Sequence, residues 1–125
     1  MTVEIRCSPG KGRGVFACRH IPAHHSIAVV PANLYSPTDG AALLASPAFP
    51  YVFIDPAYPE RHFLVWGSVA LLNHSGEPNA KPLFTNAPGA DPAHWQCNLV
   101  ALRDIDEGDE ITMRYANAAD YTGLK

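Results

Sequence analysis

The sequence predicts an all-β or β-rich α+β domain. Twelve prolines and nine glycines are spread through most of the 125 residues, which breaks the chain into short pieces and excludes long helices. Between these breaks lie short segments rich in β-branched and aromatic residues, a composition typical of strands. With 47% hydrophobic residues the chain can form a core, and its length suits one domain spanning residues 1–125.

The expected elements follow in chain order. We expect strands at Val3–Cys7, Gly14–Ala17, Ile27–Val30, Val52–Ile54, His62–Trp66, Gln96–Leu102 and Glu110–Arg114. Two helical turns are expected at Asp39–Leu44, with Thr38 as the cap, and at Ser68–Leu72. The proline-rich segment Asn33–Pro59 is predicted to be largely a loop. The polar segment Thr85–Ala93 is predicted to be a hairpin connection or an insertion.

Composition and charge exclude several classes of protein. The net charge of −3 argues against a protein that holds nucleic acid by bulk electrostatics, whereas a basic protein tail would not be repelled. No stretch approaches the roughly 18 apolar residues of a membrane span, and Met1–Cys7 lacks the pattern of a signal peptide. The three cysteines, Cys7, Cys18 and Cys97, are odd in number and contain no CxxC pair, so we expect them to be free thiols in a reducing cytoplasm. Because no apolar stretch is long enough, we expect no membrane association.

A glycine-rich turn, Gly10–Gly14, joins the first two expected strands. Its three alternating glycines allow positive φ angles and a close approach of the backbone to a ligand, although a tight hairpin would need the same residues. A Walker phosphate loop is excluded because Lys11 is followed by Gly12 and Arg13 instead of Ser or Thr. A dinucleotide fingerprint is excluded because no helix follows.

The segment Asn73–Ala80 begins where an apolar run ends abruptly in polar residues. A Ser–His hydrolase is the first idea to test. His74 and Ser75 are neighbours that point to opposite faces of an extended chain, so they cannot act as a nucleophile–base pair, and no GxSxG elbow exists elsewhere. Taken alone, the segment is equally consistent with a buried polar turn that fixes the path of the chain.

The last expected strand follows an acidic run. Five of the seven residues in 104–110 are acidic, which is usual for a solvated turn, and the spacing of an EF-hand calcium site is absent. Along the strand, Ile111, Met113 and Tyr115 share one face. A lone tyrosine at the end of an apolar face is more often a core residue than a catalytic one.

Together these segments resemble the SET-domain family of protein lysine methyltransferases. Three motifs carry the resemblance in the family's order: Gly12-Arg13-Gly14; then Asn73-His74-Ser75 with Pro78-Asn79; then Arg103-Asp104-Ile105, Gly108-Asp109-Glu110-Ile111 and Tyr115. Order and spacing agree over residues 4–117. The resemblance implies a β-clip fold of small curved sheets with a C-terminal pseudoknot, in which the Asn-His segment threads beneath the loop carrying the late tyrosine.

The resemblance also implies an activity, the transfer of a methyl group from S-adenosylmethionine to a lysine ε-amine of a protein substrate. The cofactor would bind on one side, and the target lysine would enter a channel from the other. The resemblance assigns roles to six residues. Lys11, Gly12 and Arg13 would cradle the methionine end of the cofactor. Asn73 and His74 would contact the cofactor, with His74 binding the adenine edge, and Tyr115 would be the catalytic residue. The alternatives are a SET fold without strong catalysis that binds a protein partner, and an unrelated β-rich fold that binds sugar or phosphate.

The chain departs from the family pattern in three places. Gly76 stands where many members have cysteine, and no cysteine follows Tyr115, so we expect no zinc site or other metal. Met113 is expected in the substrate channel, where the family often has an aromatic residue, and this leaves the number of methyl groups transferred open. The tail 116–125, with Tyr121, or a second subunit would complete the channel. The aromatic-rich segment Tyr51–Trp66 favours the second of these, with a second copy of this chain as the partner in a homodimer.

Overall fold

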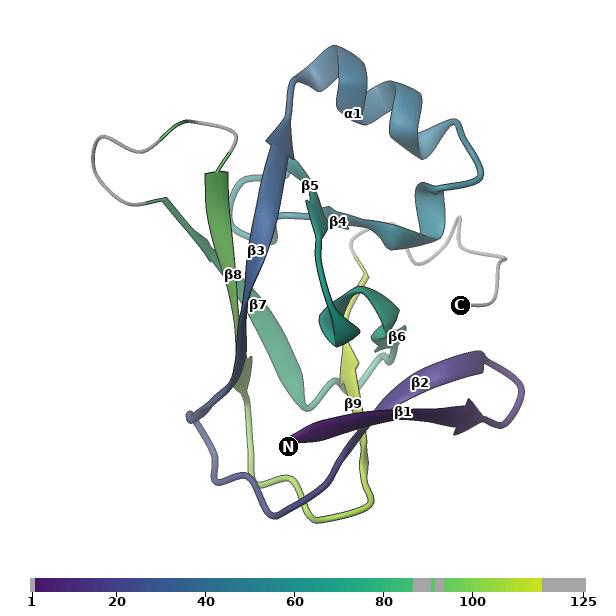
Figure 1. Ribbon diagram of the computed structural model, residues 1–125, viewed down its shortest axis with the longest axis vertical. Coiled ribbons are helices and arrows are strands. Elements are labelled where there is room, and N and C mark those ends of the chain that lie inside the picture. The colour runs from purple at the N-terminus through teal and green to yellow at the C-terminus, as the bar shows by residue number, and fades with distance from the viewer. Residues whose placement is uncertain (1, 87–90, 92–93, 116–125) are drawn as a thin grey trace.

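The computed structural model describes residues 2–86, 91 and 94–115, and its architecture is mostly β (Figure 1). Its strands are β1 (Val3–Ser8), β2 (Gly12–Ala17), β3 (Ser26–Tyr35), β4 (Val52–Ile54), β5 (His62–Val65), β6 (Asn73–His74), β7 (Ala80–Thr85), β8 (His94–Ala101) and β9 (Glu110–Met113). Its helices are α1 (Pro37–Leu44), η1 (Phe49–Tyr51) and η2 (Ser68–Leu71). The predicted β-rich class is confirmed. None of the helices described has the length and apolarity that a membrane crossing requires.

The strands form two sheets, and the smaller one gathers three distant parts of the chain. Its order is β1-β2-β9-β6. The β1–β2 hairpin, at the lower right of Figure 1, is antiparallel, and β9 runs antiparallel to β2. The short strand β6 then pairs with β9 in parallel. Residues from the beginning, the middle and the end of the sequence therefore lie side by side.

The larger sheet has the order β4-β5-β3-β8-β7, with β3 at its centre. The strand predicted at Ile27–Val30 was too short, because β3 continues through Pro31 to Tyr35. The carbonyl of Pro31 accepts a hydrogen bond from the Trp66 amide at 3.1 Å, so the nitrogen of Pro31 also faces the β5 side. Since β5 has already ended at this point, no sheet hydrogen bond is lost to the missing N–H.

Strand β7 was not predicted, because Pro82 lies in its middle. It forms one edge of the larger sheet, where proline is tolerated, and it pairs with β8 from Ala80 to Thr85. Its side chain Phe84 stacks on Phe63 of β5 with ring centroids 4.1 Å apart. The segment after β7 joins two antiparallel neighbours, as a hairpin connection does.

Helix α1 confirms the helical turn predicted at Asp39–Leu44, although it begins at Pro37, one residue before the predicted cap. Thr38 is not the cap: the hydroxyl of Ser36 accepts the hydrogen bond from the amide of Asp39 at 3.1 Å. Pro37 occupies the first turn, where its missing N–H costs nothing. Gly40 faces β5 so closely that a Cβ there would lie 2.3 Å from Nδ1 of His62.

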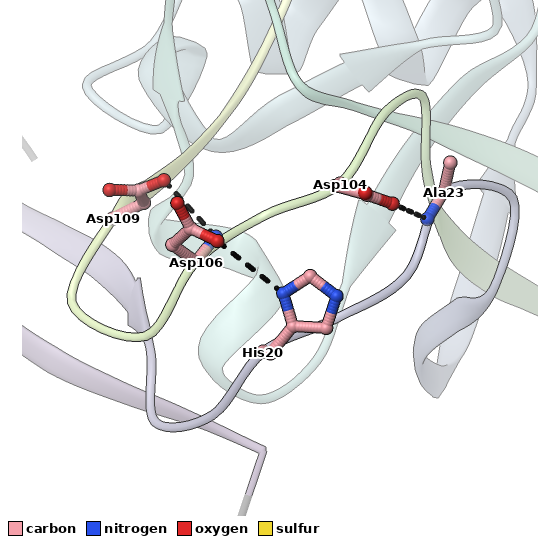
Figure 2. Close-up of polar contacts among 5 residues, drawn as sticks. All are labelled: His20, Ala23, Asp104, Asp106 and Asp109. Atoms are coloured by element: carbon pink, nitrogen blue, oxygen red, sulfur yellow. Dashed lines mark hydrogen bonds and ion pairs between the residues drawn. The ribbon is translucent and has the colours of Figure 1, made fainter.

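The acidic run is an ordered turn that binds the β2–β3 connection (Figure 2). A carboxylate oxygen of Asp104 accepts a hydrogen bond from the amide of Ala23 at 2.8 Å. Asp106 lies 3.4 Å from Nδ1 of His20, and its own amide donates to Asp109 at 3.1 Å. Within the part of the chain that the structure describes, no three His, Cys, Asp or Glu side chains are grouped as a metal site requires. The acidic side chains shape the loop that leads into β9.

Candidate active site

The glycine turn uses its glycines for two different physical reasons. Gly10 and Gly12 have φ angles of 75° and 80°, which confirms the positive φ expected of this turn. Gly14 is instead required for space, since a Cβ there would lie 2.5 Å from Oε2 of Glu110 and 3.1 Å from Nδ2 of Asn73. The close approach at Gly14 is therefore to two side chains of the protein itself.

Asn73 links the glycine turn to the late strand. It is 3% exposed, and its Nδ2 donates to the carbonyl of Arg13 at 2.8 Å and to Oε2 of Glu110 at 2.8 Å. The second carboxylate oxygen of Glu110 accepts a hydrogen bond from the hydroxyl of Ser8 at 2.7 Å. One buried amide and one carboxylate thus join β1, β2, β6 and β9.

The parallel pairing of β6 with β9 places Asn73 and His74 beside the last strand. Asn73 lies opposite Thr112, His74 lies opposite Met113, and the amide of Ser75 donates to the carbonyl of Met113 at 2.9 Å. In a strand, alternate residues turn their backbone groups to the same side. Since Ser75 faces β9, the N–H and C=O of His74 point away from β9. Among the described residues no other strand covers that side, because β6 is an edge strand of its sheet.

Tyr115 lies against the Asn73–His74 segment. Its backbone amide donates to Nδ1 of His74 at 2.9 Å, and its hydroxyl donates to the carbonyl of Leu72 at 2.5 Å. The two rings are 5.4 Å apart between centroids, and Tyr115 is 9% exposed. An amide hydrogen can be donated to Nδ1 only if that nitrogen carries no proton. The geometry therefore assigns the proton of neutral His74 to Nε2.

Comparison with known proteins identifies this arrangement. A family model, the SET domain, matches residues 12–116. The chain belongs to the SET-domain family. A crystal structure from Plasmodium falciparum, described provisionally as that of a histone methyltransferase, matches with a TM-score of 0.71 and 22% identity, covering 93% of this chain and 94% of that one. At this identity the likeness shows the fold. A search of curated proteins finds no match.

The SET domain brings most of the predicted site residues together. The contacts run from the carbonyl of Arg13 to Asn73, and from the adjacent His74 to Tyr115. Met113, which was predicted to line the substrate channel, is 3% exposed and packs within the core. Tyr121 and the rest of the tail lie outside the described residues.

Two residues of this SET domain site, Ser8 and Glu110, were not predicted. They are 102 positions apart in the sequence, and the pattern around each is that of an ordinary turn and an acidic run. One signal was present: Glu110 directly precedes the apolar residues of the last strand. A carboxylate at the start of a buried strand needs hydrogen-bond donors around it. Ser8 is 2% exposed, as expected of a hydroxyl that serves such a partner.

A large cavity lies beside β7. Its volume is about 830 Å³, and its walls are mainly apolar, with contributions from β7, from the turn after β4 that contains Tyr58, and from Arg114. Tyr58 and Leu83 on its walls are 50% and 42% exposed.

Of the aromatic residues in Tyr51–Trp66, Phe53 and Phe63 are buried, so they are not available to a partner subunit. The homodimer stays a prediction.

The environment of His74 favours its neutral form. Burial lowers the pKa of its imidazole below the ordinary value of 6.5, and the positive charges of Arg114 and Lys11 lower it further. The unfolded chain therefore takes up a proton at a higher pH than the folded one does. Keeping His74 neutral therefore stabilises the folded protein against the unfolded one. This stabilisation is fully present above about pH 6.5 and is lost as the pH falls through the lowered pKa of the folded state.

We expect the imidazole resonances of His74 to titrate with a midpoint below the ordinary value of 6.5. Replacing Arg114 with glutamine should raise that midpoint, because one of the two neighbouring positive charges is removed. NMR titration of the histidine ring protons measures the shift. Arg103→Gln is the matched control, because Arg103 is another exposed arginine whose guanidinium binds a loop carbonyl, that of Pro78. An equal shift in both variants would contradict the assignment to Arg114.

Proposed function

We propose that this SET domain transfers a methyl group from S-adenosylmethionine to the ε-amine of a lysine in a protein substrate. The supporting observation is the convergence of the glycine turn, Asn73-His74 and Tyr115 through direct hydrogen bonds. Together they supply what such a reaction needs: the glycine turn and Asn73 for the cofactor's methionine end, His74 for its adenine, and Tyr115 for the reacting amine.

The residues present fit the cofactor in two respects. The outward N–H and C=O of His74 form a donor and an acceptor on a strand edge that no other described strand covers, which is the pattern that binds the edge of an adenine ring. At the other end, Lys11 supplies a positive charge for a carboxylate. No atom of the described residues lies within 4 Å of the position that a Cβ of Gly10 would take, so the turn has open space beside it for a ligand. When bound, S-adenosylmethionine supplies a methyl group on a positively charged sulfur.

The protein must present a neutral amine in line with that methyl group. A free lysine has a pKa near 10.4, and entry into an apolar channel would lower that pKa because burial disfavours the charged form. The amine proton leaves to solvent before the site closes. Tyr115 and the Leu72 carbonyl, already joined by a hydrogen bond, then orient the amine and the methyl group. Such alignment accounts for up to about 7–11 kcal/mol of barrier reduction in favourable cases.

Cofactor binding and methyl transfer test the proposal directly. Titration calorimetry should show S-adenosylmethionine binding in the range of about 1 μM to 1 mM that is usual for enzyme substrates. Incubation of the protein with the methyl-labelled cofactor and cell lysate should then place label on protein lysines. Binding without label would indicate a SET fold that serves as a binding module. The absence of both would contradict the proposal.

A further inference from the structure

Glu110 is the residue through which the parts of the site are connected. Ser8 donates to Oε1 and Asn73 to Oε2, so both carboxylate oxygens are engaged. The backbone on either side is also held: Asn79 donates from Nδ2 to the carbonyl of Glu110 at 2.8 Å and accepts from the amide of Thr112 at 2.9 Å. The carboxylate is therefore fixed in position at the entry to β9.

This fixed carboxylate determines how the Asn73 amide is oriented. Both Nδ2 hydrogens point at acceptors, the Arg13 carbonyl and the Glu110 carboxylate. A flipped amide would place Oδ1 against these same two oxygens, and two acceptors in contact repel. The carboxylate strengthens the preference, because hydrogen bonds to a charged group are roughly twice as strong as neutral ones. Among the described residues, no donor contacts Oδ1.

We propose that Glu110 is a positioning residue that orients the Asn73 amide so that Asn73 presents only an acceptor, Oδ1, to the ligand. An acceptor selects a donor group, and at the methionine end of the cofactor this group is the α-ammonium. The inference rests on the proposed function for the identity of the ligand. The orientation of the amide itself follows from the contacts of the free protein.

The test compares two ligands that differ in the recognised group. S-adenosylhomocysteine carries the α-ammonium, whereas 5′-methylthioadenosine keeps the adenosine and lacks the amino-acid end. Glu110→Gln should weaken binding of the first about tenfold, the value of roughly one hydrogen bond, and change binding of the second less than about twofold. Titration calorimetry measures both affinities. Glu107→Gln removes the same charge from an exposed position of the same turn and should change neither.

A second measurement needs no ligand. In the free protein, the side-chain amide protons of Asn73 should give shifted, slowly exchanging NMR signals, and Glu110→Gln should move them towards the values of a solvated amide. Ser8→Ala, which removes one of the two donors that hold the carboxylate, should move both readouts in the same direction by a smaller amount.

The outcomes separate this inference from the proposed function. Equal weakening of both ligands by Glu110→Gln, with the fold intact by thermal melting, would show a general structural role and overturn the inference alone. Unchanged Asn73 amide signals would overturn it as well. If the unaltered protein bound neither ligand, the cofactor assignment would fail together with the inference.

Discussion

Replacing Asn73 with aspartate will destabilise the protein more than any other single change of similar shape at the site. The substitution keeps the volume of the side chain, but it puts a second carboxylate about 2.8 Å from Oε2 of Glu110 and removes the donor to Arg13. A buried charge left without its partner costs about 3–5 kcal/mol. Urea unfolding at neutral pH should show a loss of this size in the free energy of unfolding.

The pH dependence identifies the cause of this loss. Two carboxylates in contact raise the pKa of one of them, so a proton shared between them relieves the repulsion. The destabilisation by Asn73→Asp should therefore be smaller at about pH 5 than at about pH 8. Combining it with Glu110→Gln should recover part of the stability, because an amide can donate to the new carboxylate. A loss that neither acid nor the second substitution reduces would contradict the explanation.

Asn33→Asp is the matched control. The change is chemically identical, but the Asn33 side chain accepts a hydrogen bond through Oδ1 from Nε1 of Trp66 at 2.8 Å. An aspartate can accept the same bond, and Asn33 is only half-buried. Its substitution should cost less than about 1 kcal/mol, because it leaves neither a buried unpaired charge nor a cavity.

Removing the hydroxyl of Tyr115 should have the largest effect on activity. In Tyr115→Phe, methyl transfer should fall about 100-fold or more, because the phenol oxygen that orients the amine and the methyl group is lost and a small misplacement of the reacting atoms has an effect of this size. Folding stability should fall by only about 1 kcal/mol, the value of the hydrogen bond to the Leu72 carbonyl. Binding of the cofactor should change little, because the contacts proposed for it lie at the glycine turn and at Asn73-His74.

Single-turnover rates with saturating labelled cofactor, together with cofactor affinities, separate these effects. Tyr35→Phe removes a hydroxyl from the end of β3, on the larger sheet, and should leave both quantities unchanged. Equal methyl transfer by Tyr115→Phe and the unaltered protein would remove Tyr115 from its catalytic role. A parallel loss of affinity and rate would indicate that the tyrosine organises the cofactor site.

Local features made part of the fold predictable. The alternation around Ile111 and Met113 and the β-branched segments near Val52 and Phe63 predicted strands that the structure contains. Strand β7 was missed because its proline excludes a central strand, and the sequence does not show which strands lie at an edge. The Thr38 cap was wrong because Ser36, followed by Pro37, has the stronger combination of cap and first-turn residue.

The site was predictable only where a family motif marked it. Asn73, His74 and Tyr115 were identified by resemblance, and the structure brings them into contact. The Ser8–Glu110 pair was not found. Glu110 lies in one of the motifs but received no role, and the local sequence around neither residue requires the other. Their interaction exists only after β2 has paired with both β1 and β9 in the smaller sheet. Pairwise contacts of this separation depend on the whole topology, which no local pattern encodes.

The parallel pairing of β6 with β9 also affects how the molecule is made. On the ribosome, the glycine turn and Asn73 emerge well before Glu110 and Tyr115, so the earlier segments have no β9 to pair with. Contacts between residues so far apart in sequence form slowly, because the intervening chain must first be ordered. The site therefore cannot form until β9 has emerged, and a chain stalled before β9 would lack the strand that pairs with both β2 and β6.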